Sequence, residues 1–298
     1  MIISASYKTD IPAFYGPWFI NRLEAGYCKM VNPYGGQIYE VPLTPNHVDG
    51  FVFWTRNLGP FERHLPEIKD RGYPFTVQYT VTGYPKILDA ATIAPEKAVE
   101  HLGRLAQTFP SAGVWRYDPI VFTSLTPFDW HIENFGTLAG MLTGSVDEVV
   151  VSFAQIYQKT RRNLNKAEGL VWGDEGAETK QALLAALLPI AQRHGMRLSL
   201  CAQRELLIDG VADAACIDAE RLSRVAGRLI GAKRKPHREA CGCWQSRDIG
   251  DYDTCPHGCA YCYAVRSREL AKQRYQAHDP NSPFLFEPAK KVTRTYPT

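Results

Sequence analysis

The residues best suited to chemistry are three cysteines near the end of the chain, in the segment Cys255-Pro-His-Gly-Cys259-Ala-Tyr-Cys262. Thiolates at this C-x3-C-x2-C spacing can bind three irons of a cubane [4Fe–4S] cluster. Because the segment holds no fourth cysteine, the fourth iron would keep an open position where a ligand can bind and react. The alternative is a zinc site with His257 as fourth ligand. A compact triplet favours the cluster, since zinc usually closes a tetrahedron from two separated ligand pairs.

The other cysteines also gather late in the chain, which has 8 in total. Only Cys28 stands apart, and the four left outside the triplet suffice for a second, closed site. We expect these four to bind an auxiliary iron–sulfur cluster or a zinc ion, and they are Cys201, Cys216, Cys241 and Cys243. The alternative for Cys201 and Cys216 is that they are small buried hydrophobic residues.

Composition predicts a compact protein of a reducing compartment. The 298 residues, 45% of them hydrophobic, suffice for a full core, and a net charge of +3 does not demand a nucleic-acid partner. The first residues are too polar for a secretory signal, so we expect a cytoplasmic location and no disulfide framework. No apolar run approaches the ~18 residues that a membrane-spanning helix needs, so we expect no membrane contact.

Strand and helix patterns alternate along the chain and predict an α/β fold of parallel βα units. Six short apolar segments are typical of buried strands, at residues 2–6, 50–54, 75–81, 113–116, 148–152 and 196–200. Helical spacing appears between and after them, at 17–25, 61–71, 95–108, 127–143, 177–194 and 263–276. We expect one integrated domain, in which residues 1–206 form a six-unit βα core and the cysteine-rich residues 207–298 fold back onto it.

Polar residues come directly after these strands, and the carboxyl ends of parallel strands are where α/β proteins build active sites. The candidates are Asp10, Arg56, Asn57, Arg116, Asp118 and Gln203. Arg116 and Asp118 lie two residues apart and can clamp the charged parts of a cofactor or substrate. The alternative for Asp10 and Asp118, which precede Pro12 and Pro119, is that they are helix N-caps.

The triplet, with Tyr261 before its last cysteine, resembles the signature of the radical S-adenosylmethionine (SAM) enzymes. That resemblance implies that SAM binds the open iron and that one electron cleaves it to a 5′-deoxyadenosyl radical. It implies Tyr261 beside the adenine and a partial TIM-like (βα)6 barrel. Those enzymes carry the triplet after their first strand, whereas here it follows all six predicted strands. We therefore expect a circular permutation with the cluster loop at the C-terminus. No Gly-Gly-Glu stretch, which usually holds the SAM amino group, is present.

Several segments together resemble domain-of-unknown-function family 1848. They are Thr9-Asp-Ile-Pro-Ala-Phe-Tyr15, Phe53-Trp-Thr-Arg-Asn57, Trp115-Arg-Tyr-Asp-Pro119, Cys241-Gly-Cys243, Asp248-Ile-Gly250, Tyr252 and Cys255 to Ala264. The resemblance spans nearly the whole chain, and its last segment is the most specific. It implies an iron–sulfur protein and supplies no substrate.

The leading hypothesis is a radical SAM enzyme that abstracts hydrogen from a small-molecule or nucleic-acid substrate and takes its electron from a flavodoxin or ferredoxin. A narrower version is a DNA lesion lyase similar to spore photoproduct lyase, with Lys159, Arg161 and Arg162 on phosphates. The alternative is a non-enzymatic iron–sulfur or zinc protein that senses redox state or binds nucleic acid. That alternative leaves the polar strand ends unexplained.

Overall fold

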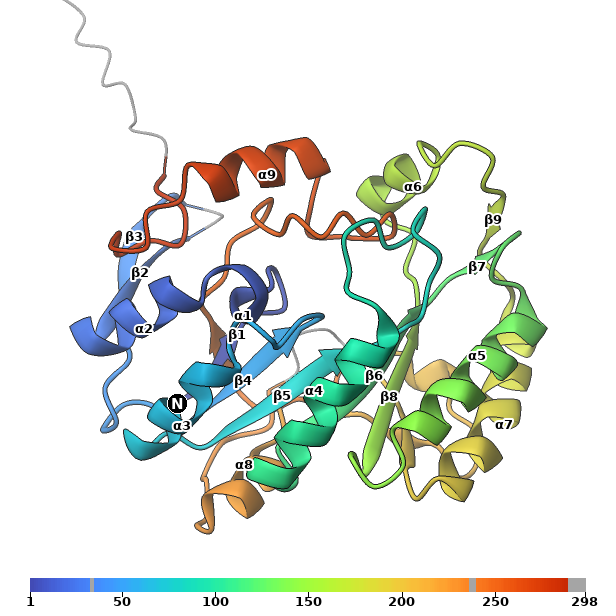
Figure 1. Ribbon diagram of the computed structural model, residues 1–298, viewed down its shortest axis with the longest axis horizontal. Helices are drawn as coiled ribbons and strands as arrows, with labels where there is room; N and C mark the ends of the chain where they lie inside the picture. The colour runs from blue at the N-terminus through green and yellow to red at the C-terminus, as the bar shows by residue number, and fades with distance from the viewer. Residues whose placement is uncertain (33–34, 236–239, 289–298) are drawn as a thin grey trace, which may run out of the picture.

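The computed structural model describes residues 1–32, 35–235 and 240–288, and its main feature is an eight-stranded sheet (Figure 1). All neighbouring strands in this sheet are parallel. The order across it is β11 (Ala212–Asp213), β10 (Arg197–Leu200), β8 (Glu148–Phe153), β6 (Gly113–Ile120), β5 (Phe75–Thr80), β4 (Gly50–Thr55), β1 (Ile2–Ala5) and β12 (Ser246–Asp248). The strands from β1 to β11 therefore follow chain order, and β12 extends the sheet beyond β1.

Helices and two small antiparallel sheets complete the described fold. The helices are α1 (Ile11–Phe14), α2 (Gly16–Ala25), α3 (Leu65–Asp70), α4 (Pro95–Thr108), α5 (Phe128–Met141), α6 (Gln158–Leu164), α7 (Ala177–Arg193), α8 (Ala219–Ala226) and α9 (Arg268–Gln276), with 3-10 turns η1 (Glu62–His64) and η2 (Arg204–Leu206). The small sheets pair β2 (Tyr27–Val31) with β3 (Ile38–Pro42), and β7 (Phe122–Thr123) with β9 (Trp172–Gly173). In the described part of the chain, no helix has the length and apolar character needed to cross a membrane.

The two faces of the main sheet bury different sets of side chains, because successive strand residues point to opposite faces. Phe51 and Phe53 of β4 belong to the larger core cluster, together with apolar residues of α2, α4, α5 and α7. The alternate residues Val52 and Trp54 belong to a smaller cluster with Leu222 of α8. We call the face that carries Val52 and Trp54 the inner face. Both sides of the sheet are therefore covered, as a parallel sheet requires.

The six predicted strands are present as β1, β4, β5, β6, β8 and β10. The prediction of six strands is two too few, since the main sheet also includes β11 and β12. These two strands have two and three residues and carry Asp, Ser and Arg side chains, so they give no apolar run for the sequence pattern to detect. Both come from the segment 207–298, which therefore contributes the two edges of the main sheet.

Five predicted helices are present as α2, α3 with η1, α4, α5 and α7. The helix expected over 263–276 is wrong in its first five residues, because α9 begins at Arg268. Ser267 caps it: its hydroxyl accepts a hydrogen bond from the backbone N–H of Leu270 at 3.1 Å. The sequence pattern predicts neither the hairpin β2–β3 nor helices α1, α6 and α8. In Figure 1, α9 and α6 lie at the same end of the molecule, beyond the ends of the strands.

Candidate metal and cofactor site

The triplet loop, residues 255–262, follows strand β12 and lies against the loop that follows β5. Cys259 forms an isolated antiparallel bridge with Asp89. The backbone N–H of Ala91 donates to the carbonyl of His257 at 2.9 Å, and that of Ala260 donates to the carbonyl of Leu88 at 2.8 Å. The loop is therefore fixed by backbone bonds to the carboxyl-terminal end of the sheet.

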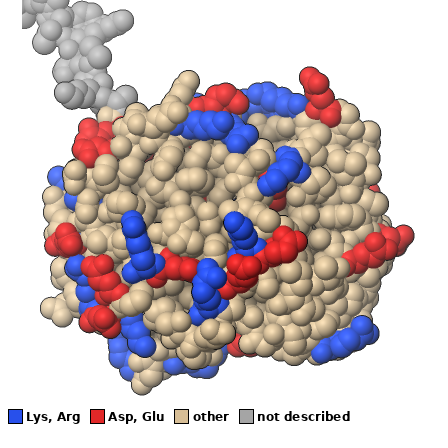
Figure 2. Space-filling model, in the orientation of Figure 1, with Lys and Arg blue, Asp and Glu red and all other residues tan. Residues whose placement is uncertain are grey.

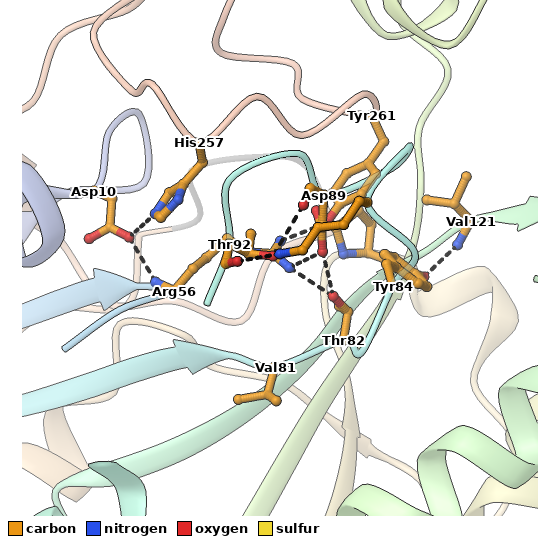
Figure 3. Close-up of polar contacts among 12 residues, drawn as sticks. Asp10, Arg56, Val81, Thr82, Tyr84, Asp89, Thr92, Val121, His257 and Tyr261 are labelled. Atoms are coloured by element: carbon orange, nitrogen blue, oxygen red, sulfur yellow. Dashed lines mark hydrogen bonds and ion pairs between the residues drawn. The ribbon is translucent and has the colours of Figure 1, made fainter. Parts of the chain in front are cut away.

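A buried ion pair anchors the same loop from below (Figure 3). The Arg56 guanidinium, after β4, pairs with the Asp89 carboxylate, which is 1% exposed. The Tyr261 hydroxyl donates to Asp89 Oδ1 and accepts from Arg56 Nη1, both at 2.6 Å. Thr82 adds bonds to both charged groups at 2.7 and 2.9 Å. Burial alone would lower the pKa of Arg56, but the adjacent Asp89 raises it well above its usual value, so the guanidinium stays charged.

Asp10 links three elements with one carboxylate. Its Oδ1 accepts the N–H of Ala13 at 2.9 Å, so Asp10 is the N-cap of α1, as the alternative for it predicts. Its Oδ2 also accepts the backbone N–H of Arg56 at 2.7 Å and contacts His257 Nε2 at 2.8 Å. His257 Nδ1 is buried and has no hydrogen-bond partner among the described atoms. Asp10 therefore both caps a helix and orients a side chain of the triplet loop.

The three thiols line one cavity of about 220 Å³. The cavity is bordered by α6 and by the start of α9, and its other polar lining residues are Asn163, Lys166, His257, Ser267, Arg268 and Glu269. Tyr261 is not among the lining residues, so its predicted place beside an adenine remains a prediction. The cavity thus combines soft thiol ligands with cationic, carboxylate and amide groups.

Without a metal, the surroundings hold the triplet thiols neutral. Burial and the nearby Asp10 carboxylate raise the pKa of Cys255 to about 12. Burial raises the pKa of Cys259 well above its usual value despite the opposing charge of Arg56, and burial also raises the pKa of Cys262. In the described residues, no three Cys, His, Asp or Glu side chains converge closely enough to hold a single metal ion. A cubane does not require that convergence, because each thiolate binds a different iron.

Arg116 and Asp118 pair with each other within β6, so Asp118 is not a helix N-cap. Arg116 also lies over the Trp54 ring, with its guanidinium carbon 4.9 Å from the ring centroid, and bonds to Gln78 Oε1 at 3.1 Å. Both members of the pair are largely enclosed, and Ser152 Oγ donates to Asp118 at 3.2 Å. The predicted pair is therefore formed, and it lies outside the cavity lined by the triplet.

Two other predicted residues bind backbone N–H groups. Asn57 Oδ1 accepts the N–H of Gly59 at 3.2 Å, and Gln203 Oε1 accepts the N–H of Phe153 at 2.7 Å. Neither lines the cavity that contains the thiols. Their expected contact with a cofactor remains a prediction.

The four other late cysteines lie together, as the sequence predicts. Cys201 Sγ and Cys216 Sγ are 3.3 Å apart, Cys216 also hydrogen-bonds with Cys243, and Cys243 with Cys241. The bond from Cys201 favours the Cys216 thiolate, but the bond with Cys243 and burial outweigh it and raise the pKa of Cys216 to about 12. Cys216 also belongs to a hydrophobic core cluster and Cys201 packs against it, as the alternative for these two predicts, whereas Cys28 is buried in β2.

A family model for a domain of unknown function, DUF1848, matches residues 2–264, which run from β1 through the triplet. The chain belongs to the DUF1848 family. No curated protein and no solved structure matches the chain. The region that defines the DUF1848 family therefore includes both cysteine groups and all eight strands of the main sheet.

Sequence reasoning missed two carboxylates of this DUF1848 protein. Asp89 lies in a loop and has no pattern around it that distinguishes it from a solvated residue. Asp248 of β12 accepts bonds from the hydroxyls of Ser4 and Ser6, both at 2.8 Å, and from the N–H of Tyr7 at 3.1 Å. Its only signal was its place in the family segment 248–250. Asp248 ties the end of β12, from which the chain leads to the triplet loop, to β1 and the chain directly after it. Asp89 binds Tyr261 within the loop itself.

The basic residues assigned to phosphates lie in α6. The Lys159 ammonium lies 5.1 Å from the centroid of the Tyr252 ring, and Arg162 Nη2 donates to the carbonyl of Arg266 at 3.2 Å. Arg161 is exposed. On the face shown in Figure 2, basic and acidic side chains are interspersed, whereas a nucleic-acid site usually shows a basic stripe.

Proposed function

We propose that the chain is a radical SAM enzyme that binds a [4Fe–4S] cluster through Cys255, Cys259 and Cys262 and abstracts hydrogen from a substrate. The observation that carries the proposal is the place of the triplet, which follows β12, the strand that pairs with β1. Radical SAM enzymes carry their triplet after the first barrel strand. If β12 corresponds to that first strand, the triplet of this chain follows the same strand of the barrel as in those enzymes.

The strand order supports the circular permutation. Starting from β12, neighbouring strands run β12, β1, β4, β5, β6, β8, β10 and β11, all parallel. A partial βα barrel has this sequential, parallel order, whereas doubly wound sheets reverse direction at a switch point. In this permuted barrel, β12 would occupy the position of the first strand. It and the cluster loop that follows it would come last in the chain instead of first. Helix α9 would be the helix that follows the cluster loop.

The residues present fit an iron–sulfur cluster. All three cysteines line one cavity, and so does His257, whose buried Nδ1 has no hydrogen-bond partner among the described atoms. Gly258 has φ +76° between two of the cysteines, a conformation that favours glycine and lets the loop curve tightly. Arg56 favours the thiolate of Cys259 and would offset part of the negative charge of a thiolate-bound cluster.

Cluster and SAM, when bound, would supply the electron and the carbon radical that removes hydrogen from the substrate. The chain would bind and orient them. Lys166 and Arg268 line the cavity and would bind the SAM carboxylate, and Glu269 would bind its amino group in place of the missing Gly-Gly-Glu stretch. Arg56, Asp89 and the loop bonds would keep the three sulfurs in place during turnover.

The test is electron paramagnetic resonance of anaerobically reconstituted, reduced protein, recorded with and without SAM. We expect a cubane signal that changes when SAM is added, and release of 5′-deoxyadenosine. Both should be lost in Cys259→Ala and kept in Cys28→Ala, because Cys28 is buried in β2 away from the triplet loop. A signal indifferent to SAM would refute the enzyme and favour a redox protein. Absence of any cluster would favour the alternative that the triplet binds zinc.

A further inference from the structure

Four cysteines from three separate parts of the chain meet at the inner face of the sheet. Cys201 directly follows β10, Cys216 follows β11, and Cys241 and Cys243 precede β12. All four lie in or against the same core cluster as Val52 and Leu222. Three of them are less than 9% exposed. None of the four lines the cavity of the triplet, so they form a separate group.

The spacing of the sulfurs fits a single metal ion better than a cluster. Each thiol contacts the next in the series Cys201, Cys216, Cys243 and Cys241, and the sulfurs of Cys201 and Cys216 are 3.3 Å apart. Four thiolates bound to one zinc ion at 2.3 Å in a tetrahedron lie about 3.8 Å apart. Ligands of a cubane bind separate irons, so they lie further apart than atoms in contact.

Two N–H groups already point at these sulfurs. Arg116 Nη1 donates to Cys216 Sγ at 2.9 Å, and the backbone N–H of Ile217 donates to Cys243 Sγ at 3.4 Å. Four thiolates on a divalent ion carry a net charge of −2, which a buried site must offset. A guanidinium and a backbone N–H directed at the ligand atoms are the surroundings that stabilise such a centre.

The Cys-Gly-Cys segment is shaped for this close approach. A Cβ atom on Gly242 would lie 2.9 Å from the carbonyl oxygen of Ala214, two residues before Cys216. Any side chain at 242 would therefore push Cys241 and Cys243 away from Cys216. The glycine keeps the two segments in contact at the point where their thiols meet.

We propose that Cys201, Cys216, Cys241 and Cys243 bind one Zn²⁺ ion in a closed tetrahedral site that ties β10, β11 and the segment before β12 together. Binding exchanges four thiol protons for four S–Zn bonds, with no change in oxidation state. Among the described residues, no three ligand side chains yet surround a common point. The outer thiols, Cys201 and Cys241, must therefore turn inward when they lose their protons. This inference is independent of the proposed enzyme activity.

The test uses a full-length variant in which Cys255, Cys259 and Cys262 are all replaced by Ser, so that bound metal reports the second site alone. The variant is freed of metal, titrated with Zn²⁺ under reducing conditions, dialysed and assayed for zinc by mass spectrometry. We expect about one zinc per chain and a higher melting temperature with zinc. Co²⁺ in place of zinc should give the absorption spectrum of a tetrahedral thiolate site.

Adding Cys241→Ser and Cys243→Ser should abolish zinc binding and the thermal shift, whereas adding Cys28→Ser should leave both unchanged. Failure to bind zinc would overturn the proposal. So would an iron–sulfur absorption in the same variant that depends on Cys243 after reconstitution with iron and sulfide. If the variant does not fold, zinc is counted in the chain with its triplet intact. Equal zinc in Cys28→Ser and Cys243→Ser would then overturn the proposal, and less zinc in Cys243→Ser would support it.

Discussion

Replacing Asp89 by Asn should destabilise the protein strongly and loosen the triplet loop. Asp89 is 1% exposed and accepts bonds from Arg56, Tyr261 and Thr82. The substitution keeps the shape of the side chain but removes the charge, so the buried Arg56 loses its counter-ion. Breaking a buried ion pair from one side costs about 3–5 kcal/mol. We therefore expect the free energy of unfolding to fall by about 3–5 kcal/mol.

A second substitution measures the contribution of the Tyr261 hydroxyl, which bridges Arg56 and Asp89, apart from that of the ion pair. Tyr261→Phe removes one donated and one accepted bond but leaves Arg56 and Asp89 paired. Losing hydrogen bonds to charged groups costs about 1.5–3 kcal/mol. Because both substitutions act on one network, the double variant should lose less than the sum of the single losses.

The assay is urea unfolding of metal-free, reduced protein, followed by circular dichroism. The matched control is Glu62→Gln, which breaks the surface pair between Glu62 and Arg104, where the Arg104 side chain is 52% exposed. Exposed pairs contribute at most about 1 kcal/mol. The reasoning is refuted if Asp89→Asn costs no more than Glu62→Gln. The iron content after reconstitution should fall in Asp89→Asn and stay at the wild-type value in the control.

Two further predictions concern pH and the triplet loop. Burial lowers the pKa of His131 to about 4, so its neutral form stabilises the fold fully above pH 6.5, and this stabilisation, about 3 kcal/mol, is lost as the pH falls toward 4. The difference in unfolding free energy between wild type and His131→Gln should therefore shrink from pH 7.5 to 4.5. A difference that stays constant over this range would contradict the lowered pKa of His131. Gly258→Ala should reduce the iron bound per chain, because a Cβ there would lie 2.4 Å from Arg268 Cδ. Gly72→Ala has a similar backbone strain, φ +88°, with no atom near its Cβ, and should keep its iron; equal iron in both variants would show that the clash is harmless.

The sequence alone determined the features that depend on local pattern. The three consecutive valines within Glu148–Phe153 identify a strand, because a strand buried on both faces needs continuous apolar residues. Pro95 marks the start of a helix for a local steric reason. The spacing of the triplet and the presence of four more late cysteines are likewise read directly from the sequence. Local pattern also singled out Arg116 and Asp118, because they stand two residues apart; the structure extends β6 to include both.

Only the tertiary structure decided which distant residues meet. Strand β12 has three polar residues and exists because β1 offers it a free edge, which no local pattern reveals. Asp89 becomes a buried anchor because two loops bring Arg56 and Tyr261 to it from 33 and 172 residues away. In the same way, Cys201 meets Cys216 because parallel strands place the ends of β10 and β11 side by side. Residue type thus indicates which chemistry is available, whereas strand order and packing determine where it can be assembled.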